Sequence, residues 1–432
     1  MKDQQENSKQ EYSFITEKIK KRPKSKKKIV KELGCFVAAA VAFGMIASVV
    51  MAWLVPILSQ VWEEEKAPEV ITFPQDDAEV EAELTIAPET TATIAPTPVV
   101  NVVEKNLESK DYISLYSQIY QVAESVNVKN SLVTVVSVSS NVDWLNNPYE
   151  NEGQASGIVV ADNGKEYLIL TDKSVVENAE EIRVTFANGK EVEAVQKKKD
   201  GNTGLAMLAV DYQGMSQEEK KQIQLTTLGN SKLLHLGTPV LAVGSPLGTT
   251  DSVLSGNITS LKTVSDTVDV KYPLIKTDML GSSSGNGVLL NLDGEVVGIF
   301  TRGLSGLSEN GTVLAYGISE LKSIIERLSN NLGIAYLGVK CREVTKEDEE
   351  AYHMPKGVGI VNVATDSPAM KAGLQNGDII VEMEGKEIDS LRSFENIIST
   401  CEPEQLLTMT VMRSGKDKYV EVRFDVTLGV TQ

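Results

Sequence analysis

The stretch Thr277–Phe300, TDMLGSSSGNGVLLNLDGEVVGIF, is the most informative part of the 432-residue chain. It begins with a loop rich in glycine and serine, and the apolar run at 288–290 that follows predicts a buried strand. Asn-Leu-Asp-Gly at 291–294 predicts a tight turn, and residues 296–300 predict a second strand. The stretch is therefore expected to form a β-hairpin that is preceded in sequence by a Gly/Ser-rich loop.

This hairpin resembles the one that carries the nucleophilic serine in trypsin-like proteases of the HtrA (DegP-like) family. The family pattern is T-D-x-x-I-x-x-G-N-S-G-G-P-L-V-N-x-x-G-E-V-x-G-I, and residues 291–299 follow it almost letter for letter. Two more segments are similar to the family, Ala155–Val159 (ASGIV) and the pair Ala242–Gly248 and Val253–Gly256. The resemblance covers roughly residues 115–330 and implies a trypsin-like double β-barrel domain, assigned here to residues 109–331.

The strand pattern predicts the same class of fold without the resemblance. Short β-branched runs separated by Gly, Asn and Asp extend from Ser131 to about Leu261, which is typical of an antiparallel barrel or sandwich. Ala187-Asn188-Gly189 lies between two such runs and predicts a hairpin. An amphipathic pattern over Tyr316–Leu328 predicts a helix that closes the domain. The fold class expected for the chain is mainly β.

A second module follows at residues 332–432. It contains Tyr336-Leu-Gly-Val339, then Ser367-Pro-Ala-Met-Lys-Ala-Gly-Leu-Gln-Asn-Gly-Asp-Ile-Ile380, and a predicted helix at Ser393–Ser399. These motifs resemble the α+β PDZ domain that follows the protease domain in the HtrA family.

The N-terminal region predicts a membrane anchor. Residues 33–58 form an uncharged apolar run longer than the roughly 20 residues that a membrane-spanning helix needs. The run is too long for the apolar part of a cleaved signal peptide, so a retained transmembrane helix is favoured over that alternative and over a buried core helix. Residues 1–32 are strongly basic, which places the N-terminus in the cytoplasm and the later domains outside the cytoplasm.

Residues 59–108 predict a linker. Glu and Asp alternate with Pro, Thr and Ala, without a helical or strand period. A segment of this composition is expected to remain unfolded and to act as an extended tether in front of the folded domains.

Composition excludes some partners and cofactors. The formal net charge of −18 argues against a nucleic-acid partner, since phosphate binding requires a basic surface. Cys35, Cys341 and Cys401 do not have the spacing of a zinc site, and free, buried cysteines are favoured over a disulfide between the last two. We expect no metal and no cofactor.

The resemblance also places the three catalytic positions, and none holds a catalytic residue. The family histidine motif T-x-x-H-V-V corresponds to residues 171–176 and puts Ser174 at the histidine position. The aspartate motif T-D-L-A-V-L corresponds to residues 203–208 and puts Gly204 at the aspartate position, and counting back from Asn291 puts Gly285 at the serine position. A serine protease needs a hydroxyl, a base and an orienting carboxylate, so no catalytic residue is expected.

Other residues are weaker candidates for catalysis. Ser282, Ser283 and Ser284 adjoin the nucleophile position, and Lys276 is the nearest candidate base along the sequence. A Ser–Lys pair requires a desolvated lysine within hydrogen-bond reach of the hydroxyl. The possible acids Asp172 and Asp278 do not form an evident pair with these serines. The two histidines, His235 and His353, fall outside the expected site.

The PDZ-like module contains the segments that bind peptides in the family it resembles. In the family, the loop corresponding to Tyr336, Leu337, Gly338 and Val339 presents backbone N–H groups to the C-terminal carboxylate of a peptide, which adds as a strand beside a helix. On the predicted helix, Phe394, Ile397 and Ile398 are candidates for the groove or for the core. Peptide binding is favoured over a purely structural role, since the glycine that permits close backbone approach is present.

The sequence therefore favours a membrane-anchored, extracytoplasmic, HtrA-like protein that lacks proteolytic activity and binds protein C-termini or unfolded segments in envelope quality control or signalling. One alternative is an active serine endopeptidase with a rearranged nucleophile loop. Another is a structural partner in an envelope assembly. The resemblance also implies a possible homotrimer.

Overall fold

The computed structural model describes residues 41, 43–46, 48, 50–51, 68–76, 109–142, 148–306, 308, 310–416 and 418–431, without the side chains of 140–142 and 148–152. The chain divides into two units, 1–67 and 68–432. Within the predicted transmembrane run 33–58, the described residues are helical. Among the residues that the structure describes, no helix has both the length and the apolar character needed to span a membrane; most of the predicted run and the basic segment 1–32 lie outside them.

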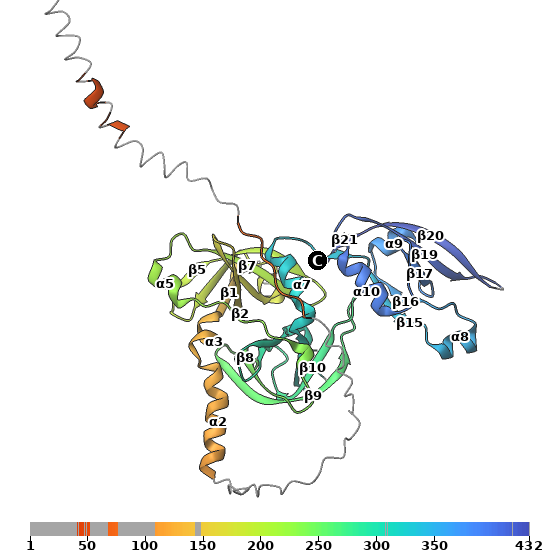
Figure 1. Ribbon diagram of the computed structural model, residues 1–432, viewed down its shortest axis with the longest axis horizontal. Helices are drawn as coiled ribbons and strands as arrows, with labels where there is room; N and C mark the ends of the chain where they lie inside the picture. Colours follow the sequence, from red (N-terminus) through yellow and green to blue (C-terminus); the bar gives the residue numbers. More distant parts are fainter. Residues whose placement is uncertain are drawn as a thin grey trace, which may run out of the picture. The chain divides into compact units, whose positions relative to one another are not determined.

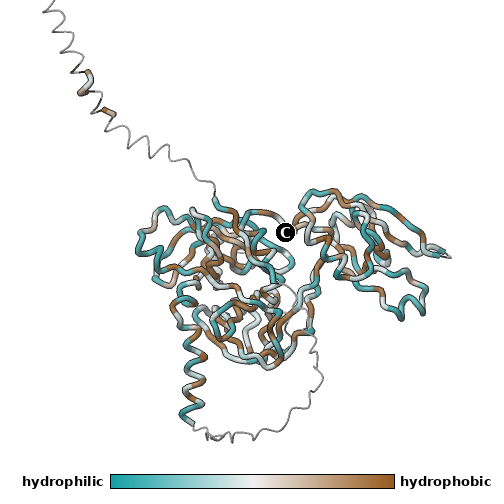
Figure 2. The backbone as a smooth tube through the Cα atoms, in the orientation of Figure 1, coloured by the Kyte–Doolittle hydropathy of each residue, from teal (hydrophilic) through white to brown (hydrophobic). Residues whose placement is uncertain are grey.

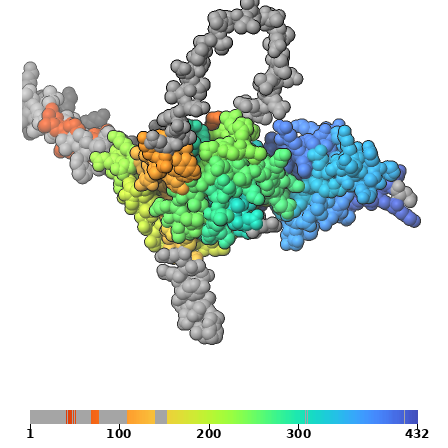
Figure 3. Space-filling model, turned by 90° about the horizontal axis from the view of Figure 1, so that it is seen from below, coloured from red at the N-terminus to blue at the C-terminus, as the bar shows by residue number. Residues whose placement is uncertain are grey.

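The second unit begins with two helices and a seven-stranded sheet (Figure 1). The helices are α2 (Ser109–Ala123) and α3 (Val126–Ser131), coloured orange on the surface in Figure 3. The sheet has the order β5-β4-β1-β2-β3-β7-β6. Its strands are β1 (Leu132–Val142), β2 (Pro148–Asp162), β3 (Glu166–Asp172), β4 (Glu181–Phe186), β5 (Glu191–Glu193), β6 (Val195–Asp200) and β7 (Leu205–Asp211). The hairpin predicted around 187–189 is confirmed, since β4 and β5 pair antiparallel.

A closed barrel follows, with the strand order β10-β13-β12-β11-β8-β9. Its strands are β8 (Pro239–Ser245), β9 (Ser252–Val264), β10 (Pro273–Leu280), β11 (Asn286–Leu290), β12 (Val296–Phe300) and β13 (Thr312–Gly317). The hairpin predicted within 277–300 is confirmed as β11 and β12, which pair from Gly287 with Phe300 to Leu290 with Val296. Short helices lie in the connections: α4 (Lys173–Val176), α5 (Gln217–Gln222), η1 (Ser231–Leu233) and α6 (Arg302–Gly306).

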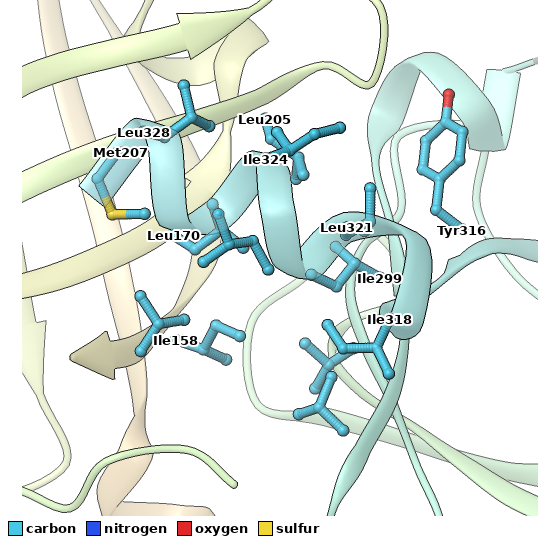
Figure 4. Packing of buried hydrophobic residues seen from close by; sticks show 14 of the residues in the cluster. Ile158, Leu170, Leu205, Met207, Ile299, Tyr316, Ile318, Leu321, Ile324 and Leu328 are labelled. Atoms are coloured by element: carbon cyan, nitrogen blue, oxygen red, sulfur yellow. The ribbon is translucent and has the colours of Figure 1, made fainter. Parts of the chain in front are cut away.

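Helix α7 (Ile318–Ser329) joins the sheet and the barrel into one core. Its buried apolar residues face Leu170, Leu205 and Met207 of the sheet and Ile299 of the barrel, as Figure 4 shows. Burial of this apolar surface is the main force that holds the two halves together. The predicted helix began too early: Tyr316 and Gly317 belong to β13, where Tyr316 pairs with Leu274 and Ile299.

The linker prediction is wrong for residues 68–76. Ile71 and Phe73 pack against the core that contains α7, and the Ile71 N–H donates to Asn330 at 2.9 Å. Asp76 forms an ion pair with the buried Lys322 of α7 at 2.7 Å. The two apolar side chains and the one carboxylate attach this short segment to the domain. The rest of the predicted linker lies outside the described residues until α2 begins.

The C-terminal module has its own core. Its main sheet has the order β15-β16-β17-β19-β20 with β18 paired to β17, and a second sheet joins β14 and β21. The strands are β14 (Ala335–Tyr336), β15 (Val339–Glu343), β16 (Val358–Val363), β17 (Ile379–Met383), β18 (Lys386–Glu387), β19 (Leu406–Ser414), β20 (Tyr419–Thr427) and β21 (Gly429–Val430). The helices are α8 (Lys346–Tyr352), α9 (Pro368–Ala372) and α10 (Leu391–Thr400). Apolar residues, brown in Figure 2, recur along these strands and along those of the sheet and barrel.

Candidate functional site

Ser174, at the predicted histidine position, belongs to the first turn of α4. Asp172 caps this helix: its Oδ1 accepts hydrogen bonds from the Ser174 N–H at 2.9 Å and from the Ser174 hydroxyl at 2.5 Å. Oδ2 of the same carboxylate accepts the Arg302 N–H at 2.6 Å. Asp172 therefore caps the helix, and Ser174, whose hydroxyl donates to it, is not a base that could accept a proton from a nucleophile.

Gly204, at the predicted aspartate position, lies in the turn between β6 and β7. Its φ is +74°, and a Cβ at this position would lie 3.5 Å from the Thr301 hydroxyl oxygen. Its carbonyl accepts the Lys173 N–H at 2.8 Å, which ties the turn to the start of α4. The turn supports the α4 backbone, but it supplies no carboxylate to orient a base.

Gly285, at the predicted serine position, has no room for a side chain. A Cβ there would lie 2.7 Å from the Pro246 carbonyl oxygen and 2.9 Å from the Ser282 carbonyl oxygen. The Gly285 N–H donates to the Ser282 carbonyl at 2.9 Å, and the Gly285 carbonyl accepts the Ser305 hydroxyl at 2.9 Å. An oxyanion hole needs N–H groups that point at the substrate, whereas this one is used inside the loop.

The serines beside this position bond to one another. The hydroxyls of Ser282 and Ser284 lie 2.9 Å apart, and the Ser284 N–H donates to the Ser282 hydroxyl at 3.2 Å. Ser283 and Ser284 are exposed to solvent. Within the described part of the chain, these hydroxyls form no hydrogen bond with a histidine, a lysine or a carboxylate.

The candidate bases and acids lie elsewhere or have other partners. Lys276 is in the middle of β10 and pairs with Leu314 of β13 and Ser260 of β9. Asp278 accepts the Asn257 N–H at 2.6 Å, and this bond lowers the pKa of its carboxyl. His235 lies exposed before β8, and His353 is the exposed C-cap of α8. These residues do not meet at the Ser282–Gly285 loop.

A cavity of about 460 Å³ lies between the sheet and the barrel, on the side of residues 185–189 and 250–253. The space beside Asp172 and Asn286 is much smaller. A cavity of about 20 Å³ lies there, lined by residues that include Ser156, Asp172, Asn286 and Thr301. The Asn286 side chain is buried, accepts the Ser156 N–H at 3.4 Å, and leaves its Nδ2 without a partner. A volume of about one water-sized sphere cannot take an amino-acid side chain of a substrate.

The predicted carboxylate-binding loop of the C-terminal module, Tyr336–Val339, already holds a carboxylate. Asp269 accepts the Leu337 N–H at 2.8 Å, the Gly338 N–H at 2.9 and 3.0 Å, and the Val339 N–H at 2.9 Å. In return, the Asp269 N–H donates to the Val339 carbonyl at 2.8 Å. Gly338 has a φ of +93°, and a Cβ there would lie 2.2 Å from the Ser367 Cβ, so glycine is required for this loop.

Asp269 belongs to the connection between β9 and β10, residues 265–272, called here the β9–β10 loop. Val270 of this loop packs against the core of the C-terminal module, and the Lys271 N–H donates to Glu395 of α10 at 2.9 Å. Burial raises the pKa of Asp269 to about 6, although the three N–H donors act in the opposite direction. Burial also raises the pKa of Glu395.

The helix residues divide between core and groove. Phe394 is fully buried in the core of the module and does not line a groove, which corrects its assignment as a binding residue. Ile397 is half-buried against the same core. A cavity of about 210 Å³ lies between α10, α7 and the β9–β10 loop, and Glu395, Asn396, Ile398 and Ser399 line its α10 side. Cys341 and Cys401 are free and buried.

Sequence reasoning missed Asp269. It follows Asp266 by three positions in an ordinary polar turn, and the sequence contains no motif that separates the two carboxylates. The signal lies in tertiary structure, because the partner N–H groups are about 70 residues further along the chain.

Comparisons with known proteins agree on both domains. Residues 155–299 match the family model described as trypsin-like peptidase domain, and residues 335–424 match that of the PDZ domain. A probable periplasmic serine endoprotease, DegP-like, from Halomonas elongata is 33% identical over 284 residues, which cover 63% of this chain and 56% of that protein. The serine protease Do-like HtrA of Lactobacillus helveticus is 28% identical over 337 residues, which cover 69% of this chain and 80% of that protein.

Among solved structures, the HtrA-type protease AlgW with decapeptide has a TM-score of 0.51 at 21% identity, covering 73% of this chain and 99% of that one. This likeness concerns the fold. The chain spans 56% of the length of the first curated relatives it matches.

Proposed function

Because this chain has the HtrA-type fold, a trypsin-like peptidase domain followed by a PDZ domain, we propose that it is a catalytically silent member of that family which binds peptide segments of other proteins through its PDZ domain. The observation that carries the proposal is Gly285: the nucleophile position lacks a hydroxyl and has no space for one.

The surrounding residues support the proposal. The Ser174 hydroxyl donates to Asp172, and the Gly285 N–H is used within its own loop. A serine hydroxyl needs an activating base to become a nucleophile. Among the described residues, the three neighbouring serines have no such partner.

The proposed location is outside the cytoplasm, with residues 33–58 as a single membrane anchor. The relatives named as periplasmic proteases and the basic segment 1–32 support this topology. The PDZ domain would then meet C-termini or unfolded segments of envelope proteins, in quality control or in signalling. A homotrimer remains part of the proposal, and the oligomeric state of the purified chain in solution is its test.

Activity-probe labelling tests the silence of the protease-like domain. The full chain is incubated with a fluorophosphonate probe and, separately, with casein, in the presence and absence of C-terminal peptides. An active HtrA protease serves as the positive control. We expect neither labelling nor cleavage, because no activated hydroxyl is available.

The alternative, an active endopeptidase with a rearranged loop, predicts a different result. Labelling of the wild-type chain that disappears in the triple variant Ser282→Ala, Ser283→Ala, Ser284→Ala would establish this alternative and overturn the proposal. Labelling that persists in the triple variant would also overturn it and would point to a nucleophile outside the loop.

A further inference from the structure

The PDZ domain of this chain binds a carboxylate that the chain itself supplies. Three consecutive N–H groups, those of residues 337–339, donate to the two oxygens of Asp269 at 2.8–3.0 Å. Asp269 is buried, at 6% exposure, and comes from a loop of the protease-like domain. The N–H groups of residues 337–339 are therefore already satisfied.

We propose that Asp269 is an internal substitute for the C-terminal carboxylate of a peptide ligand, so that the β9–β10 loop closes the PDZ site until a peptide displaces it. The proposal rests on the peptide-binding function proposed above and adds the regulation of that site.

Besides the carboxylate, the loop makes other contacts that a bound peptide would make. The Asp269 N–H donates to the Val339 carbonyl at 2.8 Å, a main-chain hydrogen bond of the kind an added strand makes at the start of β15. Val270 places an apolar side chain against the PDZ core. The Lys271 N–H reaches Glu395 on α10, the helix that faces the loop. Together these contacts occupy the carboxylate-binding loop and the neighbouring part of α10.

The conformation of Asp269 indicates that the contact is specific. Its φ is +66°, in the left-handed region, which non-glycine residues seldom adopt and which Asp adopts more readily than most of them. In this conformation, the Asp269 carboxylate accepts the N–H bonds of the PDZ domain. A loop that only connected two strands would not need to place a carboxylate there.

The other contacts of the loop permit displacement. Asp266 pairs with Lys340 at 2.6 Å, but its side chain is 81% exposed, and exposed ion pairs contribute little. Of the contacts with the PDZ domain, a peptide carboxylate and its apolar last residue would replace the N–H bonds to Asp269 and the packing of Val270. The Lys271 N–H bond to Glu395 would be broken without such a replacement. The expected competitor is a peptide with a free C-terminal carboxylate and an apolar last residue, because Val270 shows that the adjoining surface accepts an apolar side chain.

The test compares the full wild-type chain with two variants, Asp269→Asn and Asp266→Asn. The first keeps the shape of the side chain but removes the charge and directs an amide toward N–H donors. The second is the matched control, since it changes an exposed carboxylate of the same loop. The probe is a fluorescein-labelled decapeptide that ends in valine, used with a free carboxylate and as its C-terminal amide, and binding is measured by fluorescence anisotropy.

If the closed state holds at least nine-tenths of the wild-type molecules, opening it increases apparent affinity at least about tenfold. We therefore expect Asp269→Asn to bind the free-acid peptide at least about tenfold more tightly than the wild type and Asp266→Asn do, with no gain for the amide. Equal affinity of the wild type and Asp269→Asn for the free acid would overturn the proposal.

Hydrogen–deuterium exchange at residues 337–339 gives a second readout that requires no peptide. We expect protected amides in the wild type and in Asp266→Asn, and faster exchange in Asp269→Asn. Unprotected amides in the wild type, or equal protection in all three proteins, would contradict the internal contact. Released amides without peptide binding would leave the internal contact standing and count instead against the peptide-binding function.

Discussion

At the scale of single residues, Gly285 carries most of the argument about catalysis. A missing hydroxyl alone can be restored by mutation, but the backbone around Gly285 has also closed. The Pro246 carbonyl accepts the Ser282 N–H at 2.8 Å and lies 2.7 Å from the place where a Cβ would be. A serine at position 285 therefore requires the loop to move away from the end of β8.

This arrangement predicts that restoring the three catalytic side chains does not restore activity. In the triple variant Ser174→His, Gly204→Asp, Gly285→Ser, the clash at position 285 and the used N–H group remain, so we expect no fluorophosphonate labelling above the wild-type level. Circular dichroism of the variant controls for folding. Labelling of a folded variant at the introduced serine would show that the loop opens readily and that only the side chains were lost.

The triad positions are predicted from motifs that flank them beside β3, β7 and β11, and this assignment stays a prediction. The sequence did not reveal the closure at Gly285 or the carboxylate of Asp269. Both depend on contacts between distant segments: Pro246 lies 39 positions before Gly285, and Asp269 lies 70 positions before Val339. A local sequence motif shows which side chain stands at a position. Contacts between distant segments form only when the strands assemble, so a local motif does not show them.

At the scale of elements, one ion pair joins the segment 68–76 to helix α7. Lys322 is buried at 4% exposure, and its ammonium lies 2.7 and 2.8 Å from the two oxygens of Asp76. The Ser319 hydroxyl donates to the same carboxylate at 2.6 Å. Composition predicts an unfolded linker here, and that prediction failed because an average over fifty residues conceals one well-placed charge and two apolar side chains.

We predict that Asp76→Ala lowers the free energy of unfolding by about 3 kcal/mol, since it leaves a buried ammonium without its counter-charge. Urea denaturation of the full chain measures the change. Gln75→Ala is the matched control, because Gln75 is the exposed neighbour on the same segment, and surface substitutions change stability by less than about 0.5 kcal/mol. A loss in Asp76→Ala no larger than that of the control would show that the segment does not contribute to the stability of α7.

At the scale of the whole molecule, the β9–β10 loop couples the protease-like domain to the PDZ domain. In an active relative, a ligand on one domain can only influence the other through contacts that differ between the bound and the free state. In this chain the coupling element is visible: the same loop is a connection of the barrel and the occupant of the PDZ site. A peptide that displaced the loop would therefore release the PDZ domain from the barrel, whether or not the barrel has catalytic activity.

The strength of this coupling depends on pH, and the sign follows from the Asp269 carboxyl. Its pKa is about 6 when the loop is docked, compared with 3.8 as the ordinary value, because burial penalises the charged form more than the N–H donors stabilise it. A raised pKa means that docking takes up a proton, so its contribution to docking is complete below pH 4 and is lost as the pH rises through about 6. Glu395 shifts in the same direction through burial, while the nearby Tyr336 and Cys341 have raised pKa values and remain neutral over this range. The cation Lys271 opposes the shift of Glu395 without being its largest cause.

We therefore predict that docking of the loop is stronger at pH 5 than at pH 7. The equilibrium constant for docking changes by about tenfold for each pH unit of this interval that lies between the undocked and the docked pKa of Asp269. Hydrogen–deuterium exchange at residues 337–339 of the full chain, corrected for the intrinsic effect of pH on exchange, measures the protection. Asp269→Asn is the control, because it has no carboxyl to titrate at this position, so that any pH dependence left in it comes from other groups such as Glu395. Protection that rises from pH 5 to pH 7 in the wild type would reverse the sign and show that the N–H donors, rather than burial, determine the ionisation of Asp269. Protection that falls equally in the wild type and in the variant would assign the pH dependence to Glu395 and leave Asp269 charged throughout.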